Sequence, residues 1–115
     1  MIKIRILIPA LEDKGLESSV SPHFGHCPFF ALFDTETNRL KMVENVLDHG
    51  NPMLTPVDQI MKYKPDIVYA LGMGQRAIML FGEKGIKLKT GNLTIVRAVL
   101  DNLDNLEDLE HGCMH

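Results

Sequence analysis

The sequence predicts an α/β fold with three layers, in which a mixed five-stranded sheet has helices on both faces. Two observations predict this class. Residues 53–103 alternate short apolar runs, which are typical of strands, with amphipathic patterns that are typical of helices, and this order favours parallel strands. Residues 28–44 contain two further strand patterns separated by a polar turn, which predicts an antiparallel hairpin.

The first part of the chain predicts three strands. Residues 2–8 are rich in β-branched side chains and end at Pro9, and residues 28–34 are apolar nearly throughout, as in a strand buried on both faces. Residues 39–44 alternate between apolar and polar side chains, which is typical of a half-exposed strand. Residues 10–27 form a long connection rich in Gly, Ser, Pro and His, and such connections are often functional.

A helix is predicted to begin after Thr55. Pro56 takes the first helical position, and Asp58, three residues after Thr55, completes a capping box. Pro65 ends this helix, and residues 66–71 form a fourth strand that is again a continuous apolar run.

Two helices and one strand complete the predicted fold. Gly72-Met73-Gly74 turns into a helix over residues 75–81, and residues 86–88 form a short fifth strand. Asn92 caps a last helix, which carries one apolar stripe as far as Leu103.

The length of 115 residues suits a single domain, which we expect over residues 1–103. Residues 104–115 are acidic and then end in His111-Gly112-Cys113-Met114-His115. We expect this last segment to be a flexible tail.

Composition and charge argue against several classes of protein. The net charge of −3 argues against nucleic-acid binding, which usually needs a basic face. No apolar run approaches the roughly 18 residues that cross a membrane, and the charged N-terminus does not resemble a signal peptide. We therefore expect a cytoplasmic protein, a monomer or weak homodimer, whose thiols stay reduced. In that compartment a cysteine beside histidines indicates a metal ligand or a redox group.

The most concentrated chemistry lies in residues 21–30, where His23, His26 and Cys27 fall within five residues. A thiolate and two imidazoles on a kinked loop are ligands for a transition metal or a metal–sulfur cluster. A closed zinc site needs four ligands, so this incomplete set favours a transferable cofactor or a shared site. The alternative is structural: His23 caps a turn, His26 is exposed, and Cys27 is a small buried hydrophobic residue.

The C-terminal segment is a candidate for completing this site, because Cys113 and His115 are spaced to bind one metal ion. After the last helix, seven extended residues reach about 23 Å, which brings the chain back toward the loop. The alternative is a disordered tail that touches nothing.

The turn Gly72-Met73-Gly74 is predicted to lie near the same loop. Ligands of open α/β sheets bind beyond the carboxyl ends of parallel strands, and the first and fourth strands both deliver their loops there. Gly72 and Gly74 would let the backbone approach a ligand closely. The first N–H groups of the next helix, together with Arg76, would favour an anionic ligand. The alternative is a tight strand-to-helix turn without a ligand.

No catalytic residue is predicted. The chain contains no Walker A sequence and no nucleophile elbow. Asp34 and Asp66 are expected at the end of the sheet opposite the His/Cys loop, as residues at strand and turn boundaries. A small metal-dependent hydrolase is therefore the least favoured function.

Several motifs together resemble the dinitrogenase iron–molybdenum cofactor-binding family of small proteins. In this sequence they are Ser-Pro-His-Phe-Gly-His-Cys-Pro-Phe-Phe (residues 21–30), Asn51-Pro52, Pro65-Asp66-Ile67-Val68, Leu71-Gly72-Met73-Gly74-Gln75-Arg76-Ala77 and Gly85-Ile86-Lys87-Leu88. The resemblance covers most of the chain. It implies a ribonuclease H-like fold and the binding of an iron–molybdenum or other iron–sulfur-type cluster without enzymatic turnover. The ligand region that it implies is His23, Phe24 and Gly25, with His26 and Cys27 by proximity.

The residues and the resemblance together predict a non-enzymatic carrier or chaperone for a metal–sulfur cluster, which works with cluster donor and acceptor proteins. The resemblance extends to a relative that binds a mixed molybdenum–copper sulfide cluster, so copper and other transition metals are further candidates. The alternative is a protein-interaction or regulatory module without a cofactor, in which the histidines are incidental.

Overall fold

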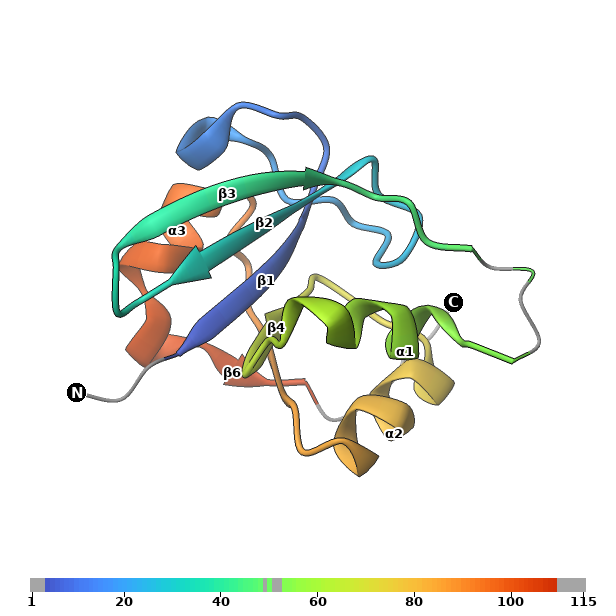
Figure 1. The fold of residues 1–115 in the computed structure, drawn as a ribbon. Coiled ribbons are helices and arrows are strands. Elements are labelled where there is room, and N and C mark those ends of the chain that lie inside the picture. Colours follow the sequence, from blue (N-terminus) through green and yellow to red (C-terminus); the bar gives the residue numbers. More distant parts are fainter. Residues whose placement is uncertain (1–3, 49, 51–52, 110–115) are drawn as a thin grey trace.

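One mixed sheet with the strand order β3-β2-β1-β4-β5-β6 organises the computed structural model, which describes residues 4–48, 50 and 53–109 (Figure 1). The strands are β1 (Arg5–Ala10), β2 (Phe29–Asp34), β3 (Arg39–Glu44), β4 (Ile67–Tyr69), β5 (Lys87–Thr90) and β6 (Glu107–Asp108). The helices are α1 (Pro56–Ile60), α2 (Gln75–Glu83) and α3 (Val96–Asp101), with short 3-10 turns η1 (Gly15–Glu17), η2 (Met61–Tyr63) and η3 (Leu103–Asn105). The predicted α/β class is confirmed.

The sheet has parallel and antiparallel parts. β1 pairs in parallel with β4, and β4 pairs in parallel with β5. β2 and β3 form the predicted antiparallel hairpin, and β2 also pairs antiparallel with β1. Because β1 and β4 run in the same direction, the loops that follow them leave the sheet at the same end.

The prediction of five strands is wrong, because β6 adds a sixth strand antiparallel to β5. β6 has two residues, both acidic, so no apolar alternation marks it in the sequence. Backbone pairing holds it instead, and Lys89 Nζ lies 2.5 Å from the carboxylate of Asp108. The chain follows β5 as far as Leu109, whose N–H donates to the Leu88 carbonyl at 3.0 Å. The narrower ribonuclease H-like assignment stays a prediction.

Helices cover both faces of the sheet, as predicted. On one face, Val57 of α1 and Phe81 of α2 belong to a hydrophobic cluster with Leu7 of β1. On the other face, Val96 of α3 belongs to a second cluster with Ile8, the next residue of β1. Successive side chains of a strand point to opposite faces, so β1 contributes to both cores. None of the described helices is long and apolar enough to cross a membrane.

The capping box predicted for α1 is confirmed. The hydroxyl of Thr55 accepts a hydrogen bond from the Asp58 N–H at 3.2 Å, and the Asp58 carboxylate accepts one from the Thr55 N–H at 3.1 Å. Lys84 adds an ion pair at 2.8 Å from Asp58, which ties the start of α1 to the end of α2.

α3 begins at Val96, later than the sequence predicts from Asn92. The N–H of Val20 donates to the Thr94 carbonyl at 2.8 Å, and the N–H of Val96 donates to the Ser18 carbonyl at 3.0 Å. These bonds hold the residues before α3 extended against the connection between β1 and β2. That connection is therefore part of the folded structure and positions the loop described next.

Candidate functional site

The His/Cys loop and the turn after β4 lie together at one end of the sheet. The ring of Phe24 lies 5.9 Å from that of Phe30 and 5.8 Å from that of Phe81, measured between centroids. Cys27 and Met73 belong to the same hydrophobic cluster as these rings. The structure thus brings together two segments that are about fifty residues apart in the sequence.

Backbone hydrogen bonds hold both ends of the loop. At its start, the N–H of Ser21 donates to the Pro9 carbonyl at 2.9 Å, and at its end the N–H of Asn45 donates to the Pro28 carbonyl at 3.0 Å. The Ser21 hydroxyl also accepts from the His23 N–H and donates to the His23 carbonyl, both at 3.2 Å. The loop is therefore a fixed turn between β1 and β2.

Asn45 is a residue of this site that the sequence analysis missed. Its side-chain amide donates to the carbonyl oxygens of Gly25 at 2.9 Å and Cys27 at 2.7 Å, and it lies 3.8 Å from Cys27 Sγ. Gly25 itself is buried and has a φ of +92°, a conformation that favours glycine. The only signal in the sequence is the hairpin register, which places Asn45 opposite Pro28 and hence beside the loop.

Cys27 faces the protein interior, with 3% of its surface exposed. Burial raises the pKa of its thiol, although backbone groups and the Asn45 amide act in the opposite direction. Because its pKa is raised, Cys27 in this conformation is a protonated core residue at neutral pH. The thiolate, which is the form that binds metals, is therefore disfavoured here.

The two histidines lie on the outside of the loop. His23 and His26 are both exposed, and His23 takes part in the turn with Ser21. The exposure of His26 and the burial of Cys27 agree with the structural alternative for these two residues, whereas at His23 the turn bonds come from the Ser21 hydroxyl and the His23 backbone. Within the described residues, no group of three or more His, Cys, Asp or Glu side chains is placed to hold a metal ion.

The residues of the turn after β4 and of the first turn of α2 differ in how exposed they are. Met73 is 2% exposed, so its side chain packs in the core, in the same hydrophobic cluster as Cys27. Gly74 caps α2 with ordinary extended backbone, and a Cβ placed there would meet no atom within 4 Å. Gly72 is half-buried, and Arg76 is exposed in the first turn of α2. The open space at Gly74 leaves the start of α2 accessible to a ligand, and the exposed Arg76 places a positive charge there.

Cys113 and His115, the proposed additional ligands, lie outside the described residues. What the structure does show is the direction of the chain before them. β6 runs antiparallel to β5, and β5 runs parallel to β4, so the chain at Leu109 heads away from the end of the sheet that carries the His/Cys loop.

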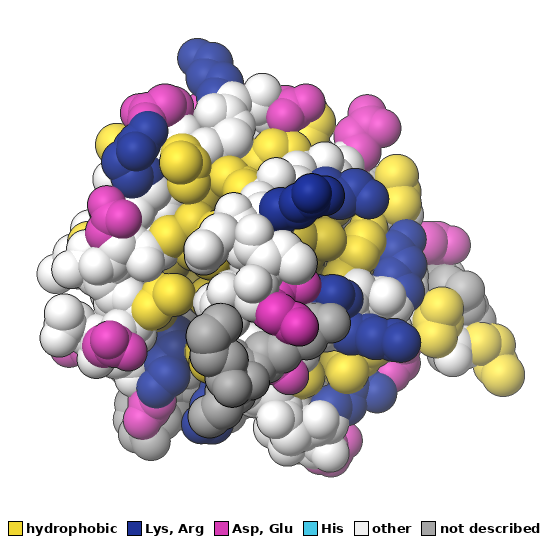
Figure 2. Space-filling model, turned by 60° about the vertical axis from the view of Figure 1, so that its left-hand side comes forward, with side chains coloured by type: hydrophobic (Ala, Val, Ile, Leu, Met, Phe, Trp, Pro, Cys, Tyr) yellow, Lys and Arg dark blue, Asp and Glu magenta, His cyan; other side chains and the backbone are white. Residues whose placement is uncertain are grey.

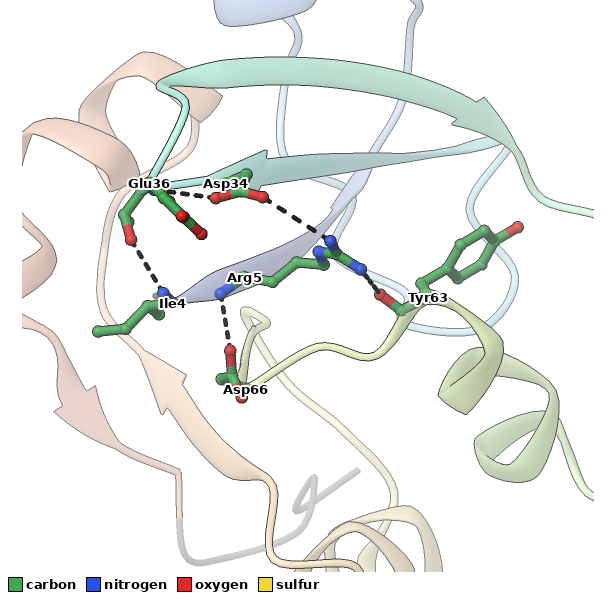
Figure 3. Close-up of polar contacts among 7 residues, drawn as sticks. Ile4, Arg5, Asp34, Glu36, Tyr63 and Asp66 are labelled. Atoms are coloured by element: carbon green, nitrogen blue, oxygen red, sulfur yellow. Dashed lines mark hydrogen bonds and ion pairs between the residues drawn. The ribbon is translucent and has the colours of Figure 1, made fainter. Parts of the chain in front are cut away.

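Asp34 and Asp66 lie at the opposite end of the sheet, as predicted, and both contact Arg5 (Figure 3). The Asp66 carboxylate accepts from the Arg5 N–H at 2.9 Å, and the Asp34 carboxylate lies 3.7 Å from the Arg5 guanidinium. The guanidinium also donates to the Tyr63 carbonyl at 2.9 Å. These carboxylates connect the first residue of β1 to the end of β2 and to the residue before β4, which is the role at strand boundaries that the sequence predicts.

The mixed sheet and the His/Cys loop at its end place this chain among small α/β proteins. Comparison with known proteins shows to which family of such proteins it belongs. The profile of the family "Dinitrogenase iron-molybdenum cofactor" matches residues 5–106. The chain therefore belongs to this family. No curated protein matches the chain.

Solved structures share the fold over nearly the whole chain. The crystal structure of PH0822 is 30% identical, with a TM-score of 0.77, and the match covers 92% of this chain and 96% of that one. The NMR structure of the Thermotoga protein TM1290, of the DUF35 family, is 23% identical, with a TM-score of 0.79 and coverage of 97% and 99%. The apo form of the orange protein from Desulfovibrio gigas is 23% identical, with a TM-score of 0.75 and coverage of 91% and 92%.

Proposed function

We propose that this chain binds a metal–sulfur cluster, of the iron–molybdenum or another iron–sulfur type, and carries it between proteins without transforming it. The main support is the family match, which spans residues 5–106 and includes the whole His/Cys loop. The cluster is cargo, so the site must release it as well as bind it. A donor protein and an acceptor protein, both in the cytoplasm, complete this proposal.

His23 and His26 make the first contact with the cargo in this proposal. Both side chains are exposed on a loop that is held at each end by backbone hydrogen bonds, so they meet solvent without any opening of the core. Imidazole binds iron, copper and zinc. Two ligands from one loop hold a cluster loosely enough for transfer, which a closed four-ligand site would hinder.

Cys27 joins as a ligand only after the loop opens. Its thiol must leave the core, give up the contacts with Asn45 and lose a proton before it can bind a metal. Cluster binding through this sulfur should therefore release a proton and strengthen with rising pH. Asn45 controls this step, because its amide holds the backbone on which the thiol sits.

The start of α2 supplies the charge that an anionic cluster needs. Arg76 is exposed there, and the first N–H groups of α2 carry partial positive charge. Since Met73 is buried, the contribution of this turn comes from the backbone of Gly72 and Gly74 and from Arg76. Cys113 and His115 are proposed as further ligands, which requires the chain to turn back toward the loop after Leu109.

Anaerobic reconstitution tests the proposal. The purified chain is incubated with ferrous iron and sulfide, with and without molybdate or cuprous ion, and is then desalted and analysed for metal and for visible absorption. We expect a coloured protein with a defined metal content. The double variant His23→Ala/His26→Ala should lose most uptake, and Cys27→Ala should bind but release metal faster.

Matched variants separate loop ligands from incidental binding. His49→Ala removes the same side chain outside the loop and should leave uptake unchanged, and Cys113→Ser/His115→Ala tests the C-terminal segment. If the reconstituted wild type stays colourless and free of metal under all these conditions, the chain is not a cluster carrier. Equal uptake by the wild type and the loop variants would show that binding occurs elsewhere.

A further inference from the structure

We infer that the free edge of β3 binds an extended acidic segment of a partner protein, which adds to the sheet as a further strand. The first observation is that β3 is the last strand on its side of the sheet. Asn45 N–H donates to the Pro28 carbonyl directly opposite, and hydrogen-bonded pairs alternate along an antiparallel ladder. Leu40 and Met42 therefore direct their peptide groups away from β2, and no hydrogen bond from the described residues reaches them.

The two faces of this edge differ in chemistry. Leu40 and Met42 pack against the hydrophobic cluster under α3. Arg39 and Lys41 alternate with them, so they point to the other face, and both are exposed. An added strand would thus meet cationic side chains on one face and apolar side chains on the other.

A groove lies on the cationic face. Its volume is about 370 Å³, and Arg39, Lys41, Lys62, Tyr63, Arg5 and Asp34 are among the residues that line it. Lys62 comes from η2, and its Nζ lies 5.0 Å from the centre of the Tyr63 ring. Cationic side chains from three separate elements, β1, β3 and η2, therefore line one groove.

The groove has an excess of positive charge. Its one carboxylate, Asp34, lies 3.7 Å from the Arg5 guanidinium, while Arg39, Lys41 and Lys62 form no ion pair within the described residues. The chain as a whole has a net charge of −3, so the positive charge of this groove is opposite in sign to the net charge of the protein. Figure 2 shows Lys and Arg side chains gathered around hydrophobic ones on one face of the molecule, and none of the described histidines is visible on that face.

Protection of the edge accounts for only part of this arrangement. Lys and Arg on an edge strand discourage pairing between copies of the same protein, because like charges meet. That role needs Arg39 and Lys41 but not Lys62, which lies outside the sheet and faces the same groove. The same charges attract an acidic strand.

The geometry specifies the partner segment by its pattern. Side chains on one face of a strand repeat every second residue, about 7 Å apart. A segment that alternates acidic and apolar residues would place carboxylates opposite Arg39 and Lys41 and apolar groups beside Leu40 and Met42. Its backbone would supply the hydrogen bonds that the free edge lacks. This proposal is independent of the cluster cargo.

A synthetic peptide tests the proposal. The probe is fluorescein-labelled Gly-Glu-Val-Glu-Val-Glu-Gly, whose binding is measured by fluorescence anisotropy at low salt. Lys41→Glu should weaken binding by about tenfold, because a cross-strand attraction becomes a repulsion. Lys87→Glu makes the same charge change on β5 and should have little effect. On binding, the backbone amides of Leu40 and Met42 should shift in the NMR spectrum and exchange more slowly with solvent.

Four outcomes would overturn the proposal. They are no binding of the acidic peptide to the wild type, equal binding to the wild type and Lys41→Glu, and equal binding of a peptide in which both Val residues are replaced by proline. The fourth is displacement of the peptide by an RNA oligonucleotide or by inorganic phosphate at lower concentrations than by unlabelled peptide. That result would assign the groove to phosphate groups. Failure of cluster reconstitution would leave all of these measurements unaffected.

Discussion

The side-chain amide of Asn45 donates to the carbonyl oxygen of Cys27 across a distance of 2.7 Å. Asn45 directly follows β3, so the hairpin holds the loop whose cysteine is the candidate ligand. The same amide donates to the Gly25 carbonyl oxygen at 2.9 Å, and the side-chain oxygen of Asn45 accepts from the Leu47 N–H at 2.9 Å. A single half-buried side chain thus bonds to the backbone groups of three residues, two in the loop and one just after β3.

Replacing Asn45 with alanine should lower the free energy of unfolding by about 1–3 kcal/mol, because buried carbonyl groups lose their donor. The measurement is urea unfolding followed by circular dichroism. Asn105→Ala is the matched control, since the Asn105 side chain is exposed and makes no hydrogen bond within the described residues. An equal effect of the two variants would contradict the role assigned to Asn45.

Replacing Phe24 with alanine should cost about 1–3 kcal/mol of stability, since a half-buried ring loses its contacts with Phe30 and Phe81. Phe24→Leu keeps most of the apolar volume and should cost less. Thiol labelling of Cys27 in a Cys113→Ser background, under native conditions, should be faster in Phe24→Ala. Unchanged labelling would mean that Phe24 does not hold the loop closed.

The buried thiol of Cys27 should make stability fall at alkaline pH. Burial raises the pKa in the folded state above the ordinary value of 9.0, so the folded chain keeps the proton more tightly than the unfolded chain does. The stabilisation is complete below the unfolded pKa and is lost as the pH rises through the folded one. The wild type should therefore lose more stability than Cys27→Ala between pH 8 and pH 10. Parallel pH profiles of the two proteins would contradict this.

Asp58 should produce the opposite dependence at acid pH. The ion pair with Lys84 and the bonds with Thr55 lower its pKa from 3.8 to about 2. Stability from this carboxylate is present above the unfolded pKa and is lost as the pH falls from about 4 toward 2. Thermal melts of the wild type and Asp58→Asn should converge over this range, whereas Asp101→Asn should track the wild type.

Much of the fold was predictable because local patterns decide it. The capping box at Thr55 and Asp58 and the apolar strands carry their own signals, and the structure confirms them. β6 carries none, since Glu107 and Asp108 are held by pairing with β5. The late start of α3 at Val96 likewise depends on backbone bonds to a distant segment.

The candidate site was predictable in place but not in detail. Parallel strands brought the His/Cys loop and the Gly72 turn to one end of the sheet, as expected from strand direction alone. The inward side chain of Cys27 and the clamp from Asn45 depend on three-dimensional packing, which residue spacing does not encode. The cationic groove depends on Lys62, which is far in sequence from Arg39 and Lys41.

The burial of Cys27 should protect its sulfur from oxidation while the loop is closed. A protonated sulfur enclosed by hydrophobic side chains reacts slowly with peroxide, because oxidation proceeds through an accessible thiolate. The resting chain should keep this sulfur reduced in air, and mass spectrometry should find added oxygen on it only when the loop has opened. The oxidation rate of one atom then measures how often the protein exposes it.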